Sequence, residues 1–264
     1  MLRHDLPVPI DVRVMHLATL VLGACVVVML LFAALWSALR HSTFNLRSIT
    51  VLGDVNYNNA FTLRANVAPS LKGNFFTMDL VQTKSAFEAA PWVRRAVVQR
   101  DFPNHLRVTL EEHQSVAYWG PESETKLINQ QGEVFDANTG DLDAQDLPRL
   151  VGPDSMSSTV LTMYQSLAPL FKQKKMGIEK LELTGRGSWQ VQLDGGAGIE
   201  LGRGAPTEII SRLRIFLDTY TQAASALGRP SLESLESADL RHNNAYAMRL
   251  RGVGTVDLQA IKNR

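Results

Sequence analysis

Four histidines in the larger part of the chain, after residue 40, are the first candidates for chemistry: His41, His105, His113 and His242. An imidazole can act as a general base at neutral pH, but an enzyme also needs a nucleophile and an orienting group nearby. None of these histidines lies in a G-x-S-x-G motif, and no H-E-x-x-H, C-x-x-C or G-x-x-x-x-G-K-[ST] pattern occurs. We therefore interpret them as solvated surface histidines rather than as catalytic or metal-binding groups.

Paired carboxylates and glycines offer no catalytic arrangement either. Glu111 and Glu112 are adjacent, but neighbours on a strand point to opposite faces of a sheet. Gly195-Gly196 and Gly202-x-Gly204 are interpreted as turn glycines, because neither belongs to a G-x-G-x-x-G pattern that leads from a strand into a helix. The sequence therefore predicts a protein that is not an enzyme and that has no cofactor or metal.

Composition narrows the class of partner. Beyond residue 43 the numbers of basic and acidic residues are equal, whereas a nucleic-acid-binding domain normally carries a basic excess. The only cysteine, Cys25, lies in an apolar stretch, so the rest of the chain can form no internal disulfide. The roughly 220 residues after that stretch are enough for one large or two small domains.

The apolar stretch itself runs from Val14 to Leu39, and no charged residue lies between Arg13 and Arg40. About 20 such residues in a helix cross the ~30 Å hydrocarbon layer of a bilayer. Residues 17–35 are apolar on every face of a helix, and Trp36 suits the headgroup region near its end. The stretch predicts a transmembrane helix over residues 14–39.

Two alternatives to a retained membrane anchor are a cleaved signal peptide and a buried core helix. A signal peptide has an apolar region of roughly 7–15 residues, shorter than this one, and a core helix of this length normally shows a polar stripe. Basic residues are balanced across the stretch, but a long following domain is translocated largely regardless of charge. We expect a single-pass type II membrane protein, with residues 1–13 as a cytoplasmic tail and the rest of the chain outside.

The first 70 residues after the anchor predict a small α+β unit. Its clearest part is a hairpin, because Leu106, Val108 and Leu110 alternate with polar residues after a Pro-Asn turn. Asp79 is placed to cap the helix before the hairpin. The expected order is a strand within 44–53, a helix over 59–67, a helix from 80 to 90, and strands over 93–100 and 105–111.

The remaining chain predicts a second α+β unit. Apolar residues at helical spacing recur over 159–174 and over 206–227, and alternation typical of strands fills the segments between. The expected order is a strand over 114–119, a hairpin over 126–135, a buried turn over 147–153, the first helix, a strand over 178–183, a hairpin over 189–201, the second helix, and a last hairpin over 238–250.

The stretch APWVRRAVVQRDFPNHLRV from Ala90 to Val108 resembles the signature of the FtsQ/DivIB family of bacterial cell-division proteins. The continuation to Ala117 is also similar, with Ser115 where a proline is usual, and the triplets Leu201-Gly202-Arg203 and Asp239-Leu240-Arg241 resemble further landmarks. The resemblance implies an α+β fold: one N-terminal transmembrane helix, a POTRA domain (βααββ) over 44–113, and a mixed α/β FtsQ-type β domain over 114–258.

The same resemblance implies a non-enzymatic divisome scaffold that binds FtsB and FtsL and helps to localise and control septal wall synthesis. The residues that it places at the FtsB/FtsL surface are Arg203, Arg241, His242, Tyr246 and Leu250, with His242 where tyrosine is common and Ala245 where a glycine is usual. Independently, the strand over 245–250 is expected at a sheet edge, where its unpaired N–H and C=O groups are open to a partner strand. The alternative is that the two arginines only pair with carboxylates of the domain.

The POTRA domain has its own candidate surface, a recruitment face with Arg94, Arg95 and Arg100. By resemblance this face binds FtsK or other divisome proteins and brings the chain to the division septum. A solvated basic face is the alternative. Two other functional classes are disfavoured: an outer-membrane assembly or secretion protein needs several POTRA units or a long β-barrel, and an exported hydrolase needs a catalytic constellation.

Overall fold

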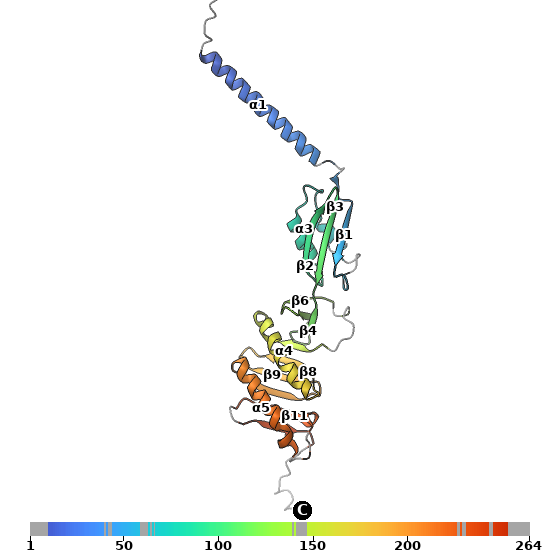
Figure 1. Cartoon of the computed structure of the whole chain (residues 1–264), viewed down its shortest axis with the longest axis vertical. Coiled ribbons are helices and arrows are strands. Elements are labelled where there is room, and N and C mark those ends of the chain that lie inside the picture. The colour runs from blue at the N-terminus through green and yellow to red at the C-terminus, as the bar shows by residue number, and fades with distance from the viewer. Residues whose placement is uncertain are drawn as a thin grey trace, which may run out of the picture. The chain divides into compact units, whose positions relative to one another are not determined.

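The structure is a computed structural model of the whole chain (Figure 1). It describes residues 10–39, 41, 44–58, 63, 65, 67–138, 140, 147–225, 228, 231–242 and 245–252. The tail residues 1–9, much of the helix expected over 59–67, the turn at 243–244 and the end of the expected second domain at 253–258 lie outside these residues.

The first element is α1, Ile10–Leu39, which is apolar over nearly its whole length. At 1.5 Å per residue its 30 residues measure about 45 Å, which is close to the thickness of a bilayer with its headgroups. Among the described residues it is the one helix long and apolar enough to span a membrane. The rest of the chain does not bury its apolar part. The helix is therefore consistent with the predicted single-pass anchor, although it begins four residues earlier than Val14.

The chain divides into two compact units between Glu112 and His113. The first holds a sheet in the order β1-β3-β2, with β1 parallel to β3 and β3 antiparallel to β2. The predicted hairpin is confirmed, and Leu106, Val108 and Leu110 are buried as expected. The elements of this unit are β1 (Ser48–Gly53), η2 (Ala68–Ser70), α3 (Leu80–Glu88), β2 (Val93–Asp101) and β3 (His105–Glu112).

Helix α3 begins where its cap predicts. The Asp79 carboxylate accepts hydrogen bonds from the backbone N–H groups of Val81, at 2.8 Å, and Gln82, at 3.2 Å, which satisfies two donors that a helix start leaves open. Thr83 and Phe87 are buried, so this face of α3 packs into the core of the unit. The cap sets where the helix begins, and the apolar face sets which side of it turns to the sheet.

The last residue of β3, Glu112, is buried and ties the end of the sheet to a distant loop. Its carboxylate accepts backbone hydrogen bonds from Asn56, Tyr57 and Asn58, the shortest at 2.8 Å, and a further bond from the Asn58 side chain. A buried carboxylate is tolerated only where donors of this kind replace water. Glu112 therefore closes the unit at the point where the chain leaves it.

The second unit is built on a nine-stranded sheet in the order β12-β11-β10-β9-β8-β7-β4-β5-β6. Parallel neighbours join β4 to β7, β7 to β8 and β10 to β11, and the other pairs are antiparallel. The strands are β4 (Ser115–Trp119), β5 (Lys126–Asn129), β6 (Val134–Asp136), β7 (Arg149–Val151), β8 (Ile178–Leu183), β9 (Trp189–Leu193), β10 (Gly198–Gly202), β11 (Leu235–Asp239) and β12 (Ala247–Leu250).

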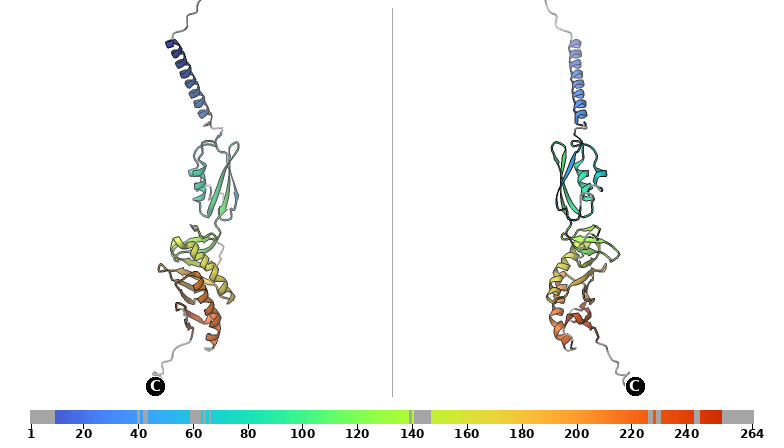
Figure 2. Two further views of the ribbon diagram at one scale, coloured as in Figure 1. Left: turned by 60° about the vertical axis from the view of Figure 1, so that its left-hand side comes forward. Right: turned by 90° about the vertical axis from the view of Figure 1, so that its right-hand side faces the viewer.

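Two helices cover one face of this sheet: α4 (Ser157–Gln173) packs against β7 and β8, and α5 (Pro206–Ser225) packs against β10 (Figure 2). Short 3₁₀ turns, η4 (Asp154–Met156) and η5 (Leu232–Ser234), precede α4 and β11. The buried faces are those that the helical spacing predicted, with Leu167 and Phe171 on α4 and Leu213 and Phe216 on α5. The opposite face of strands β8 to β12 carries mostly polar side chains.

One expectation is wrong: the segment over 147–153 is not a turn, because it contains strand β7 in the interior of the sheet. Leu150 is fully buried, and β7 pairs in parallel with β4 and with β8. The three residues of β7 are too few to show alternation. The hydrogen-bond partners that make β7 a strand lie about 30 residues away on either side. The α+β class of both units is confirmed.

Replacing Val108 with Asp is expected to unfold the first unit. The Val108 side chain is fully buried between the sheet and α3, and an unpaired carboxylate there costs several kcal/mol, comparable to the whole stability of a small domain. Thr109→Asp is the matched control, because Thr109 is the next residue on β3 and is exposed. Circular dichroism melting should show a large loss for Val108→Asp alone; equal melting of both variants and the parent would contradict this core.

Candidate protein-binding surface

Strand β12 ends the nine-stranded sheet and pairs, within the described part of the chain, with β11 alone. The backbone N–H of Arg251 donates to Ser234 O at 2.8 Å, which sets the direction of its N–H group toward β11. N–H groups alternate along an antiparallel strand, so those of Ala247 and Arg249 point the same way and those of Met248 and Leu250 point to the open edge. The edge therefore carries main-chain donors that another strand could use.

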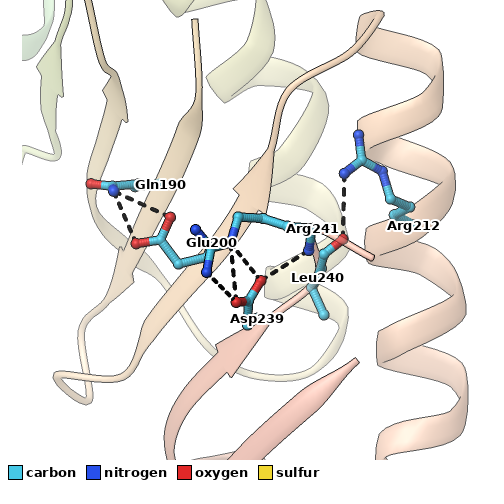
Figure 3. A network of polar contacts seen from close by, with 6 residues as sticks. All are labelled: Gln190, Glu200, Arg212, Asp239, Leu240 and Arg241. Atoms are coloured by element: carbon cyan, nitrogen blue, oxygen red, sulfur yellow. Dashed lines mark hydrogen bonds and ion pairs between the residues drawn. The ribbon is translucent and has the colours of Figure 1, made fainter. Parts of the chain in front are cut away.

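An ion pair stands beside this edge, at the end of β11 (Figure 3). The guanidinium of Arg241 donates from Nε to both carboxylate oxygens of Asp239, at 2.9 and 3.0 Å, and from Nη2 to Oδ2 at 2.5 Å. The backbone N–H of Arg241 donates to the same carboxylate at 3.0 Å. Because Arg241 bonds the carboxylate through a forked, charge-assisted contact, the geometry of this corner is well defined.

The ion pair changes the acidity of Asp239. The Arg241 side-chain hydrogen bonds lower the pKa of the Asp239 carboxyl from an ordinary value near 3.8 to about 2, and the same pairing raises the pKa of Arg241. On the neighbouring strand, Glu200 accepts hydrogen bonds from the Gln190 side chain at 2.9 and 3.2 Å (Figure 3). The polar side chains next to β12 thus bond to one another in two pairs, Gln190 with Glu200 and Asp239 with Arg241, and Arg241 is largely exposed.

Arg212 of α5 fixes the two turns that meet at this corner. Its guanidinium donates to the main-chain carbonyl oxygens of Leu201, at 2.7 Å, and Leu240, at 3.3 Å, and also to that of Arg203. Leu201 and Arg203 lie at the end of β10, and Leu240 follows β11. One side chain therefore satisfies carbonyl groups from both strand ends and holds them together.

Three of the five predicted partner residues meet at this corner of the domain. Arg241 packs on Gly202, where an added Cβ would lie 3.0 Å from Arg241 Cγ and where φ is +81°. Arg203 follows Gly202 and is exposed, and His242 follows Arg241 and is also exposed. Only glycine fits at position 202, so the triplet Leu201-Gly202-Arg203 brings Arg203 and Arg241 together through close backbone contact.

The other two predicted residues, Tyr246 and Leu250, pack inward. Leu250 is only 3% exposed. The Tyr246 ring meets Phe216 edge to face at a centroid distance of 5.0 Å, and its hydroxyl lies 3.0 Å from Thr219 Oγ1. Tyr246, just before β12, therefore attaches the strand to α5, so a Tyr246→Ala variant would test the packing of the domain as well as any partner contact.

A groove of about 550 Å³ runs beside the attached strand. It lies between α5 and the segment that leads into β12, and Ile215 of α5 exposes 58% of its surface there. The residues that line it are Arg212, Ile215, Thr219, Leu240, His242, Ala245 and Tyr246. The surface thus combines an open main-chain edge, arginines at one corner and a groove on the helix side.

The arginines predicted as a POTRA recruitment face do not share one surface. Arg94 donates to Glu111 at 2.5 Å across the β2–β3 pair. Arg100 donates to the carbonyl oxygens of Phe75, at 2.6 Å, and Met78, at 2.7 Å. Arg95 is exposed, and the alternation of β2 places it on the face opposite to Arg100.

Comparison with known proteins decides which family these features belong to. The model of the "Cell division protein FtsQ/DivIB, C-terminal" family matches residues 117–241, and that of the "POTRA domain, FtsQ-type" family matches residues 44–113. The chain belongs to the FtsQ/DivIB family. It is 36% identical over 260 residues to the cell division protein FtsQ of Thiomonas arsenitoxydans, a match that covers 97% of this chain and 94% of the relative.

Other members of the FtsQ/DivIB family align over similar lengths. The FtsQ of Burkholderia pseudomallei is 36% identical, with 92% of this chain and 94% of the relative covered. The FtsQ of Bordetella pertussis is 34% identical, with 91% and 92% covered. Family membership gives the chain a role in bacterial cell division among other division proteins, and it confirms the resemblance on which the sequence predictions rested.

Among the described residues no group of three or more His, Cys, Asp or Glu side chains could hold a metal ion.

Sequence reasoning missed Arg212 and the role of Asp239. Arg212 falls beside Leu213 on an amphipathic helix, where an arginine normally faces solvent, and its carbonyl partners are distant in the chain. For Asp239 a signal was present. Residues two apart at the end of a strand lie on the same side, so the spacing of Asp239 and Arg241 could have predicted their ion pair.

The Asp239–Arg241 pair predicts an acid dependence of stability. Asp239 has a depressed pKa in the folded protein, so the pair stabilises the fold above pH ~4, and this contribution is lost as the pH falls toward 2. Because the carboxylate is partly solvated, we expect at most about 1 kcal/mol. Chemical denaturation of the parent and of Asp239→Asn should differ at pH 6 and converge near pH 2.

The direct measurement is the carboxyl titration of Asp239 by NMR. In the parent it should titrate near pH 2, and in Arg241→Gln it should move up toward the ordinary value near 3.8. Arg249→Gln is the control, since Arg249 pairs with Glu236 and not with Asp239. An Asp239 titration near 4 in the parent would contradict the pairing.

Proposed function

We propose that this chain is a non-enzymatic scaffold of the bacterial divisome that binds FtsB and FtsL through its second domain and helps to localise and control septal cell-wall synthesis. In this proposal residues 1–13 are a cytoplasmic tail, 14–39 span the inner membrane, and the bulk of the chain lies in the periplasm at the septum. Residues 44–113 form the POTRA domain, which recruits the chain through FtsK or another divisome protein, and residues 114–258 form the β domain.

The observation that carries the proposal is the open edge of β12. Its inner side is bonded to β11, and the side chains of Met248, Leu250 and the preceding Tyr246 attach it to the core. An edge strand that is attached in this way keeps its position while its outer N–H groups remain open, which is the arrangement that strand addition requires. A partner strand of FtsB would extend the sheet with main-chain hydrogen bonds.

Side chains beside the edge would supply specificity. Arg241 is already bonded to Asp239, yet its side chain is 59% exposed and can meet a second carboxylate at its free side. Arg203 is exposed at the same corner, and His242 lines the neighbouring groove. A partner segment that carries acidic residues next to a β-strand would fit this surface by charge, and complementary charge favours the correct partner and its fast association.

Charge reversal separates the two proposed surfaces. Arg241→Glu should weaken FtsB binding by at least about tenfold. The attraction between Arg241 and an acidic residue of the partner would become a repulsion between two carboxylates, next to the carboxylate of Asp239. Arg95→Glu is the matched control: it is also an exposed arginine, but it lies on β2 of the POTRA domain, so it should leave FtsB binding unchanged. The measurement is titration calorimetry of full-length variants in detergent against the FtsB ectodomain.

The same pair of variants tests POTRA recruitment. Arg95→Glu should weaken FtsK binding, and Arg241→Glu should leave it unchanged. Both variants must keep the parental melting temperature. A folded Arg241→Glu variant that binds FtsB with parental affinity would show that the corner is not the docking site.

The main-chain contribution is tested at Met248, whose N–H points to the open edge. Met248→Pro removes this donor without removing a hydrogen bond to β11, and proline is tolerated on edge strands. Its control, Met248→Ala, removes the half-buried side chain but keeps the N–H group. If strand addition carries the binding, proline should abolish FtsB binding and alanine should retain most of it.

Two results would contradict binding by strand addition at β12. Equal affinities of folded Met248→Pro and Met248→Ala would exclude main-chain docking at this residue. Loss of binding in both variants would assign the affinity to the methionine side chain instead of the strand edge.

A further inference from the structure

Phenylalanine side chains gather at one end of the first unit. The rings of Phe44 and Phe76 meet edge to face at a centroid distance of 4.9 Å, and Phe75 lies 5.1 Å from Phe76 and 6.2 Å from Phe102. Phe75 is buried, whereas Phe76 exposes 41% and Phe102 exposes 75% of its surface. The four rings, here called the phenylalanine cluster, thus have a buried centre and an apolar rim open to the surroundings.

Main-chain hydrogen bonds hold the cluster in place. The N–H of Phe75 donates to the carbonyl oxygen of Phe44 at 2.9 Å. Arg100 of β2 donates to the carbonyl oxygens of Phe75 and Met78, at 2.6 and 2.7 Å, from the end of the hairpin next to the turn that carries Phe102. The exposed rings are therefore presented by a fixed framework.

The cluster lies at the end of the sheet where β1 begins. Ser48, the first residue of β1, is paired with His105, which directly follows the turn that contains Phe102. The N–H of Arg47 also donates to Asn104 O in that turn, at 2.9 Å. The opposite end of β1 reaches Gly53, beside Leu110 and far along β3 from the turn.

The chain connects this end of the sheet directly to the membrane helix. Four residues separate Leu39, the last residue of α1, from Phe44. Even fully extended, the connection cannot exceed about 18 Å. Since α1 is about as long as a bilayer with its headgroups is thick, Leu39 ends in or near the headgroup region and Phe44 stays within reach of it.

We propose that the phenylalanine cluster rests on the lipid surface next to the membrane helix, with Phe102 and Phe76 inserted among the headgroups. A lipid surface fits the exposed rings because aromatic side chains are favoured at membrane interfaces. Arg47 and Lys72, each three residues from a ring of the cluster in the chain, are exposed and suit anionic lipid headgroups. The contact sets the orientation of the POTRA domain on the bilayer, in addition to its role in binding partners.

The test places an environment-sensitive fluorophore on single cysteines of the full-length protein, in a Cys25→Ser background. The protein is reconstituted without any partner into vesicles of phosphatidylethanolamine and phosphatidylglycerol that contain nitroxide-labelled lipid. Phe102→Cys carries the probe in the cluster. Val55→Cys is the matched control, because Val55 is an exposed apolar residue (48%) just beyond the opposite end of β1.

The probe at position 102 should be quenched by the nitroxide lipid severalfold more strongly than the probe at position 55, and it should be better protected from an aqueous quencher. Circular dichroism must show that both variants are folded. Equal quenching at the two positions would overturn the proposal. Full exposure of the position-102 probe to the aqueous quencher would likewise exclude lipid contact and leave the cluster as a surface for another protein.

Discussion

The contact between Arg212 and the carbonyl groups at the ends of β10 and β11 is the one on which the proposed binding corner depends. A guanidinium that bonds Leu201, Arg203 and Leu240 ties α5 to both turns at once. Without it these carbonyl groups would need other donors. The clamp adds to the close contact of Gly202 with Arg241 and to the hydrogen bond from the Leu240 N–H to Glu200 O at 2.8 Å. Arg203 and Arg241 keep their spacing because Arg212, which is less exposed, holds the backbone segments that carry them.

The edge strand β12 combines attachment to the core with a main-chain edge that no other described strand pairs with. The side chains of Leu250 and of Tyr246, just before the strand, belong to the core contacts, while no other strand in the described part of the chain pairs with the outer main-chain groups of β12. A strand attached through alternate side chains does not need a second neighbour to stay extended. Attachment therefore uses the side chains of these residues and not their outer main-chain groups, so substitutions of these side chains report mainly on packing.

Much of the fold could be predicted from local sequence, because its signals are local. Alternation at Leu106, Val108 and Leu110 identified β3, and the Asp79 cap located the start of α3. Strand β7 could not be recognised, since its three residues become a strand only through parallel partners far away in the chain. Such pairings have no local signature, and the parallel contact of β1 with β3 is another example.

The candidate site was predictable only in part, for a related reason. The spacing of Tyr246, Met248 and Leu250 shows that they share a face, but the position of α5 decides that this face points inward. The family landmarks named Arg203 and Arg241 as partner residues, and both lie at one corner of the domain. The clamp by Arg212 depends on carbonyl groups from two separate turns, which no motif encodes.

The buried carboxylate of Glu112 has a consequence for the order in which the chain folds. All the described hydrogen bonds of that carboxylate go to residues 56–58, and β3 pairs with β1 and β2, so every partner of the first unit has been synthesised once residue 112 has emerged. The second unit needs Leu240 and β12 before its sheet is complete. Domains that are complete early fold while synthesis continues. The POTRA domain can therefore fold before the edge strand β12 has been synthesised, so any partner strand that adds to β12 can do so only after the first unit is complete.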